Sequence, residues 1–197
     1  SYYGKKSGTA TINEFDDASL EKVVRRAEEL AALAPENPEY MPLLGPQTFK
    51  ESKTYIQSTA AMTPDDRATA VAKSITVSKD AKLEAAGFIE NETGFSAIHN
   101  SKGLFAYEME TDVTFSVTTR NAEGTGSGYA ARGFTDVKKL DTLSATKIAA
   151  QKANGSAAAK AIEPGKYTVI LEPVAATYFL ENLFRGFDAR SADEGRS

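Results

Sequence analysis

From Ala85 to Thr135 the apolar residues of this chain recur with a period of two, and no other feature constrains the fold as much. Successive side chains of a strand point to opposite faces of a sheet, so this period predicts strands with one covered face. The longest alternating run extends from Phe105 to Val117. The pattern resumes at Tyr129, after a glycine-rich turn. The stretch therefore predicts a meander of antiparallel strands.

Two shorter stretches also predict strands. Residues 8–13 are rich in β-branched side chains and predict a strand that runs into a turn. Residues 88–95 alternate around a polar centre and predict a hairpin that turns near residues 91–94.

The strongest helix pattern follows Asp16 and Asp17, which stand where an N-cap belongs. Pro35 and Pro38 mark its end. Apolar residues recur behind the cap at helical spacing and predict an amphipathic helix of about four turns. They are Leu20, Val23, Val24, Ala27, Leu30, Ala31 and Ala34. The proline-rich loop at 35–49 is expected to bury several apolar side chains, namely Tyr40, Met41, Leu43, Leu44 and Phe49.

A second helix is predicted at Thr63, with Pro64 at its first position and Asp66 completing a capping-box pattern. Its expected buried stripe is Ala68, Val71, Ala72 and Ile75. A third, alanine-rich helix follows Asp141 and is expected to end near Asn154-Gly155, with small side chains that permit close packing. The fold class is therefore α+β, with an antiparallel or mixed sheet meander flanked by amphipathic helices.

The end of the chain predicts two further elements. Pro164-Gly165 forms a turn into residues 167–171, which predict a buried strand. Pro173 then opens an apolar helix from Val174 to Phe184.

Composition excludes several classes of protein. The net charge of −4 gives no bulk attraction to nucleic acid or to an anionic membrane surface, and no apolar run reaches the length of a membrane-spanning helix. The chain has no Cys and a single His, His99, so disulfides, thiolate zinc sites and two-His metal sites cannot form within it. We assign no catalytic residue and no metal ligand.

Three features have a functional and a structural interpretation, and the structural one is favoured for two of them. His99 is expected to be a half-buried histidine at a strand end rather than a catalytic base. The glycine-rich segment at 124–128 is expected to be a hairpin loop, because a phosphate cradle needs a helix after it. Acidic pairs occur at Asp16/Asp17, Asp65/Asp66 and Asp193/Glu194. The first two are explained as helix caps and the third stays open.

Four short segments resemble one known family. Residues 164–173 read Pro-Gly-Lys-Tyr-Thr-Val-Ile-Leu-Glu-Pro, residues 8–16 read Gly-Thr-Ala-Thr-Ile-Asn-Glu-Phe-Asp, residues 100–103 read Asn-Ser-Lys-Gly, and residues 195–197 read Gly-Arg-Ser. In their order along the chain, these segments resemble the TldD/PmbA family, also called "modulator of DNA gyrase", which contains metallopeptidases. Family members are longer, so the resemblance implies an internal fragment of a larger two-part protein. Residues 1–165 would be an N-terminal-type α+β domain, incomplete at its start, and residues 166–197 the beginning of a β-rich C-terminal part.

The resemblance also separates two kinds of subunit. The TldD-like kind carries an HExxxH motif in the helix after the Pro-Gly strand, where two His bind a metal and Glu acts as the base. In this sequence the first His slot falls at Leu180 or Glu181 and the second at Arg185 or Gly186. This degenerate motif helix, and the Gly-Arg-Ser ending, resemble the TldE/PmbA kind, which lacks the metal motif.

The resemblance therefore implies a non-catalytic subunit. It would pair with a metal-bearing, TldD-like subunit, or with itself, as a dimer in a cytoplasmic protease that acts on unfolded or leader peptides. The metal, zinc by expectation, would belong to the partner, and this chain would hold no cofactor. Two alternatives stay open, namely a self-sufficient metallopeptidase with ligands outside this sequence and a non-enzymatic binding module acting on gyrase. Direct contact with nucleic acid or membrane is not expected.

Overall fold

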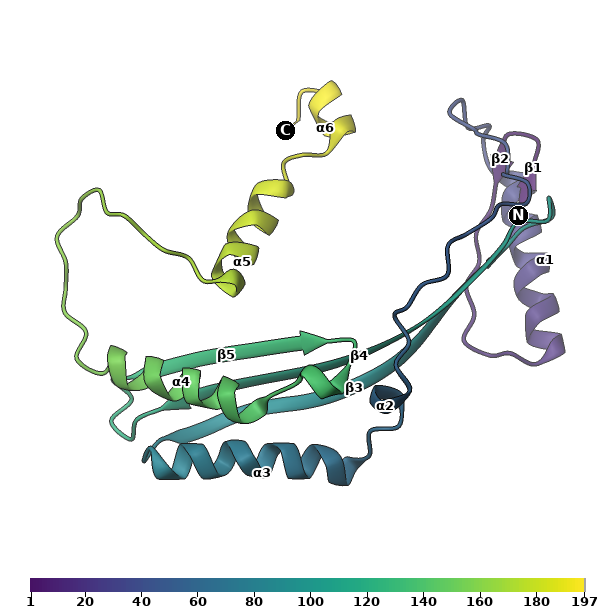
Figure 1. The fold of residues 1–197 in the computed structure, drawn as a ribbon. Coiled ribbons are helices and arrows are strands. Elements are labelled where there is room, and N and C mark those ends of the chain that lie inside the picture. Colours follow the sequence, from purple (N-terminus) through teal and green to yellow (C-terminus); the bar gives the residue numbers. More distant parts are fainter. Residues whose placement is uncertain (197) are drawn as a thin grey trace. The chain divides into compact units, whose positions relative to one another are not determined.

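The computed structural model describes residues 1–196, so Ser197 of the Gly-Arg-Ser ending lies outside the described residues. The chain divides into two compact units (Figure 1). The first contains residues 1–49 and 98–106, and the second contains residues 50–97 and the chain from residue 107 onward.

The first unit is a small hairpin packed on one helix. Strands β1 (Tyr2–Tyr3) and β2 (Lys6–Ser7) pair antiparallel around Gly4, and helix α1 spans Asp17–Leu33. The strand predicted at 8–13 is wrong. At Gly8 the backbone lies directly on α1, where a Cβ would stand 2.2 Å from the Ala31 nitrogen, and residues 9–13 have no strand beside them in the described part.

Helix α1 confirms the prediction in its bounds and its cap, because the Asp16 side chain accepts a hydrogen bond from the Ser19 N–H. Its buried face is narrower than predicted and consists of Ala27 and Ala31. The loop at 35–49 contains neither helix nor strand. The burial expected there is wrong for Met41, Leu44 and Phe49, which are exposed.

The second unit is built on most of a three-stranded sheet in the order β3-β4-β5, whose residues 98–99 and 105–106 belong to the first unit. The strands span Glu84–His99, Phe105–Arg120 and Ser127–Phe134. Strands β4 and β5 pair antiparallel from Val113↔Phe134 to Arg120↔Ser127. The predicted antiparallel meander and the α+β fold class are therefore confirmed.

The hairpin predicted near residues 91–94 is wrong, because β3 continues through this stretch to His99. The Asn91 amide is used in a tertiary contact: its Nδ2 donates to the Thr59 carbonyl and its Oδ1 accepts from Arg67. The chain turns instead at Asn100, whose Oδ1 accepts from the N–H groups of Lys102 and Leu104. Gly103 supplies the positive φ of 86° that this turn requires.

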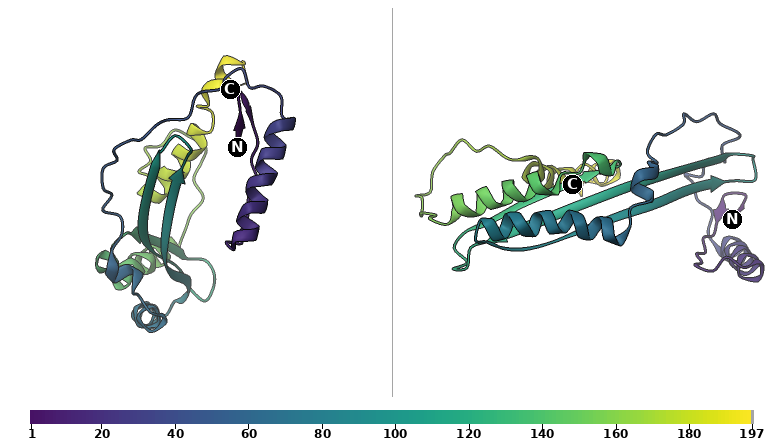
Figure 2. Two further views of the ribbon diagram at one scale, coloured as in Figure 1. Left: turned by 90° about the vertical axis from the view of Figure 1, so that its right-hand side faces the viewer. Right: turned by 60° about the horizontal axis from the view of Figure 1, so that its bottom comes forward.

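The helices of the second unit are α2 (Gln57–Ala60), α3 (Pro64–Asp80), the 3-10 helix η1 (Val137–Lys139) and α4 (Thr142–Ser156). Helices α3 and α4 lie side by side on one face of the sheet (Figure 2). Their predicted caps are confirmed: Thr63 and Asp66 form a capping box, and Asp141 accepts from the Ser144 N–H.

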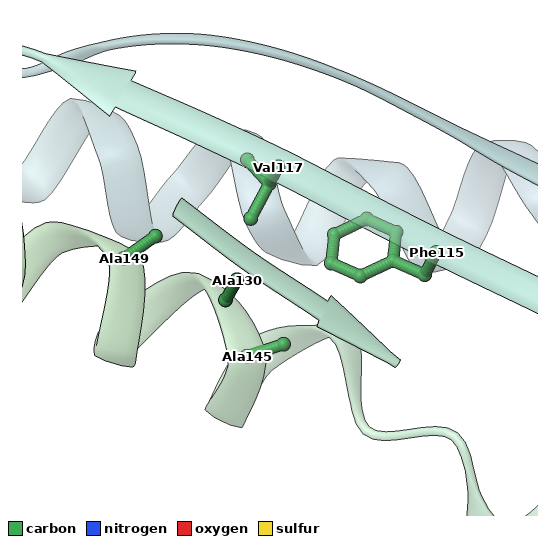
Figure 3. Close-up of a cluster of buried hydrophobic side chains, with 5 residues drawn as sticks. All are labelled: Phe115, Val117, Ala130, Ala145 and Ala149. Atoms are coloured by element: carbon green, nitrogen blue, oxygen red, sulfur yellow. The ribbon is translucent and has the colours of Figure 1, made fainter. Parts of the chain in front are cut away.

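The core of this unit lies between β4, β5 and α4. It gathers Phe115 and Val117 from β4, Ala130 from β5, and Ala145 and Ala149 from α4 (Figure 3). The alanines of α4 permit a close approach to β5, as predicted. A Cβ at Gly128 would stand 2.0 Å from the Ala149 carbonyl oxygen, and one at Gly126 would stand 2.3 Å from that of Ala153.

The buried stripe predicted for α3 is wrong. The residues that α3 buries are Ser74 and Ser78, whereas Ile75 is 45% exposed. Helix α3 packs against α4, and the Thr142 hydroxyl donates to the Ala70 carbonyl at 2.9 Å. Because this contact is close and polar, small hydroxyl side chains occupy it in place of large apolar ones.

Two helices follow α4, namely α5 (Pro173–Phe184) and α6 (Ala189–Asp193). The first was predicted to span Val174 to Phe184, and the second has no counterpart in the sequence predictions.

The contact between Gly128 and α4 generates a first prediction. We expect Gly128→Ala to destabilise the chain by about 1–3 kcal/mol, because the added Cβ meets helix backbone that cannot give way. The matched control is Gly155→Ala in α4, where a Cβ meets nothing within 4 Å. It is expected to leave stability unchanged or to raise it by up to about 1 kcal/mol. Urea denaturation measures both, and equal effects of the two variants would contradict the close approach.

The Thr119 hydroxyl generates a second prediction. It is fully buried and is the one buried side-chain polar atom without a hydrogen-bond partner in the described part of the chain. Thr119→Val keeps the shape and removes the unsatisfied group, so we expect the free energy of unfolding to rise by about 1 kcal/mol. Thr118→Val, on the opposite face of β4, serves as the control with little expected effect. A loss of stability in Thr119→Val would show that the hydroxyl has a partner.

The capping box of α3 generates a third prediction. Hydrogen bonds from the hydroxyl and the N–H of Thr63 hold the pKa of the Asp66 carboxyl below the ordinary value of 3.8. A lowered folded-state pKa means that the stabilisation is present above pH 3.8 and is lost as the pH falls through the folded-state value. An NMR titration of the Asp66 carboxyl should give a midpoint below 3.8, and Thr63→Ala should raise that midpoint. A midpoint at or above 3.8 in the unaltered chain would refute the cap.

Candidate functional site

The segment that follows α4 exposes a run of large apolar side chains in the second unit. The buried strand predicted at 167–171 is wrong: Tyr167, Val169, Ile170 and Leu171 are all exposed, and Ile170 is 93% exposed. The sequence is strand-like, but no strand of the described residues lies beside it to pair with. An unpaired apolar segment of this kind requires a covering surface.

Helix α5 continues this open surface. Pro173 occupies its first turn, where the missing N–H costs no hydrogen bond. No residue of α5 is buried. Its exposed large apolar side chains are Val174, Tyr178, Phe179, Leu180, Leu183 and Phe184. A helix that is apolar all round belongs in an interior or an interface.

The start of α5 is tied to the rest of the second unit through a lysine. Lys152 of α4 pairs with the Glu172 carboxylate and also donates to the Tyr129 carbonyl of β5 at 2.9 Å. The side chain of Lys152 is 34% exposed and that of Glu172 is 60% exposed. The pair lies at the surface, and such a pair contributes little to stability.

The four predicted motif positions lie at the end of α5. Leu180 and Glu181 are in its last turn, whereas Arg185 is the C-cap and Gly186 lies beyond it. The Arg185 N–H donates to the Glu181 carbonyl at 3.2 Å. The structure therefore places Leu180, Glu181 and Arg185 close together along one helix end.

A metal does not fit these residues. Leu180 has no donor atom and Arg185 is a permanent cation, so Glu181 is the one side chain at these positions that could ligate a metal. Within residues 1–196, no three or more His, Cys, Asp or Glu side chains form a group that could hold a metal ion. No reaction step can be derived through a metal on this helix.

His99 lies at the end of β3, as predicted, but it is exposed rather than half-buried. It lines a groove of about 1,090 Å³ in the first unit, together with Tyr2, Tyr3, Met41 and Leu44. In the described part of the chain its ring makes no hydrogen bond to an acid or to a hydroxyl. The arrangement that a catalytic histidine needs is not present around it.

The glycine-rich segment at 124–128 joins β4 to β5, so it is the hairpin loop that the sequence favoured. The Asn121 side chain closes it by accepting from the Gly126 N–H and donating to the Thr125 hydroxyl. Gly126 and Gly128 are required by the close approach of α4, because a Cβ at either position would stand within 2.3 Å of a helix carbonyl oxygen.

The acidic pairs act as caps and ion-pair partners. Asp16 and Asp66 cap α1 and α3, which confirms their structural interpretation. In the open pair at Asp193/Glu194, the structure accounts for Glu194: hydrogen bonds from Arg196 and Arg190 to its carboxylate hold its pKa below the ordinary value of 4.5.

The sequence predictions missed one charged surface. Carboxylates of β3 and β4 meet around a shallow pocket of about 290 Å³ lined by Glu92, Thr93, Gly94, Glu110 and Asp112. A signal for it was present, because residues 84–119 contain six acidic residues and one Lys. The surface was missed because the hairpin predicted at residues 91–94 placed Glu92 in a turn and not in a strand beside β4.

No helix within residues 1–196 is long and apolar enough to cross a bilayer.

Comparison with known proteins identifies the family. Residues 47–159, which contain α2, α3, the three-stranded sheet and α4, match the family model described as "PmbA/TldA metallopeptidase central domain". No curated protein matches the chain.

Solved structures share the fold. The chain is similar to TldE from Thermococcus kodakarensis, with 19% identity and a TM-score of 0.65 over 76% of this chain and 35% of that one. It is also similar to a proposed modulator of a DNA gyrase from Thermotoga maritima, with 17% identity and a TM-score of 0.72 over 83% of this chain and 38% of that one. A third similar structure is a proposed modulator of DNA gyrase from Bacteroides thetaiotaomicron, with 15% identity and a TM-score of 0.78 over 96% of this chain and 46% of that one.

The chain thus spans less than half the length of these three proteins. At such identities the likeness shows the fold alone, whereas the family model covers more than half of the chain. The chain therefore belongs to the PmbA/TldA metallopeptidase family and carries its central domain at residues 47–159.

Proposed function

We propose that this chain is part of a TldE/PmbA-like subunit, which lacks the metal motif and pairs with a metal-bearing, TldD-like subunit in the proteolysis or maturation of peptides. The observation that carries the proposal is the end of α5. The two His slots of the HExxxH motif would fall at Leu180 and Arg185, or, shifted by one residue, at Glu181 and Gly186. Neither pair could hold a metal as two His do, because Leu180 and Gly186 have no side-chain donor atom and Arg185 is a permanent cation. The metal of the pair, zinc by expectation, would be held by the partner.

The exposed apolar side chains of α5 support a role in an assembly. An apolar helix face of this kind is stable in water only when another surface covers it. A partner subunit, or a further part of the same subunit, would supply that cover. One of the similar structures is itself named TldE. The proposal places the pair in the cytoplasm, with peptides rather than nucleic acid as the substrate.

Two alternatives compete with this proposal. The chain could belong to a self-sufficient metallopeptidase whose ligands lie outside the 197 residues, with Glu181 as the base. It could also be a non-enzymatic module that acts on gyrase, since two of the similar structures are named as proposed gyrase modulators. The net charge of −4 on this chain would favour contact with the gyrase protein rather than with the DNA that gyrase binds.

The proposal predicts the outcome of a reconstitution experiment. The full-length protein that contains this chain is purified alone and analysed for zinc, iron and manganese, and its hydrolysis of an unfolded peptide is measured with and without a TldD-like subunit. We expect far less than one metal atom per chain and no hydrolysis alone. Mixed with the partner, it should form a complex whose hydrolysis is abolished by a chelator.

The variant Glu181→Gln distinguishes the alternatives. It removes the only carboxylate at the motif positions, and Glu181 is exposed, so the fold should be retained. Under the proposal the mixed subunits retain full hydrolysis, whereas a self-sufficient enzyme that uses Glu181 as its base loses it. One metal per chain in the protein alone would refute the proposal. Binding to gyrase without hydrolysis in any mixture would favour the scaffold alternative.

A further inference from the structure

The outer edge of β3 has no strand beside it within the described residues, because β3 is the first strand in the order β3-β4-β5. It is long, extending over 16 residues from Glu84 to His99, and contains no Lys, Arg or Pro. A free edge presents unpaired N–H and C=O groups, and proteins commonly protect such an edge with lysine, proline or a covering segment. None of these protects β3 in the described chain.

The charged side chains beside this edge are mostly carboxylates. Residues 84–119 carry six carboxylates and a single Lys. Glu92, Glu110 and Asp112 surround the shallow pocket on the sheet. Neither Glu92 nor Glu110 makes an ion pair with any residue of the described part. These carboxylates repel a second copy of the same edge, so they disfavour self-association and favour a cationic strand.

The side chains on the edge alternate in a way that suits an added strand. Ile89 packs against the core and Asn91 bonds to Arg67 and Thr59, so this set of β3 residues points toward the helices. Phe88, Glu90 and Glu92 consequently share the opposite, open face. On this open face Phe88 is 51% exposed. The open face therefore offers carboxylates and the aromatic ring of Phe88.

We infer that the free edge of β3 binds an extended, lysine- or arginine-rich peptide segment as an added strand. Main-chain hydrogen bonds would supply the pairing, and the carboxylates of Glu90, Glu92 and Glu110 would select the basic side chains. The inference rests on the proposed function in so far as the bound segment is taken to be the peptide substrate. It narrows that substrate to a basic class and assigns the strand that holds it.

The test measures binding of a fluorescein-labelled peptide of about ten alternating Lys and Thr residues, which spans about 33 Å as a strand. Two matched peptides accompany it. One has Glu in place of Lys, and the other keeps Lys but is N-methylated at alternate residues, which removes the backbone donors. We expect fluorescence anisotropy to detect binding of the first peptide and of neither matched one. Added salt should weaken the binding.

Protein variants locate the site. The double variant Glu90→Gln with Glu92→Gln should weaken binding about three- to tenfold, as expected for two partly exposed charge contacts. The control, Asp80→Asn with Glu123→Gln, changes the net charge equally at exposed positions outside β3 and β4, and it should bind as the unaltered chain does. Circular dichroism verifies that each variant is folded.

Three results would overturn the inference: no binding by folded protein, equal binding of the N-methylated peptide, or equal loss in both double variants. The assay contains no partner subunit and measures no hydrolysis. Its failure therefore leaves the proposed pairing intact, and a failed reconstitution leaves the peptide-binding result intact.

Discussion

At Gly128 the backbone of β5 approaches α4 so closely that an added Cβ would stand 2.0 Å from a helix carbonyl, and the second unit is organised around this contact. The approach brings Ala145 and Ala149 onto Phe115 and Val117, which are among the few large side chains that the unit buries. In a core made of small residues, the burial of each side chain contributes little to the free energy of unfolding. The stability of such a core therefore depends on dense packing over the whole interface. This explains why glycine in β5 and alanine in α4 occur opposite each other.

Polar contacts then determine how the remaining elements meet the sheet. The Thr59 hydroxyl donates to the Thr135 carbonyl and accepts from the Val137 N–H, while the Thr59 carbonyl accepts from Asn91. Thr111 donates to the same Thr135 carbonyl. Because these buried groups are satisfied only in one arrangement, they hold α2 beside β3 and β4. They also keep β3 continuous through Asn91, and a continuous β3 is what leaves a long edge without a neighbouring strand in the described residues, with Glu90 and Glu92 on its open face.

The two proposed functional surfaces differ in chemistry. The segment from Tyr167 through α5 is largely apolar, with Glu172 and Glu181 as its charged residues, as expected of a surface that is covered permanently. The edge of β3 combines backbone groups, carboxylates and the ring of Phe88, as expected of a surface that binds and releases an extended ligand. A subunit without metal ligands can contribute to peptide chemistry in both ways, by pairing with the subunit that holds the metal and by presenting the peptide.

The sequence by itself determined the elements whose signals are local. Capping residues at Asp16, Thr63 and Asp141 predict where three helices begin, and period-two alternation predicts β4, because a cap or a pleat involves neighbouring residues only. The motif helix was predicted within one residue of its observed bounds, and its lack of His pairs can be read directly. Tertiary structure alone decided that Asn91 lies within a strand, that α3 buries Ser74 rather than Ile75, and that residues 167–171 stay unpaired. Each of these depends on which distant segment supplies a hydrogen-bond partner or a packing surface, and local sequence does not carry that information.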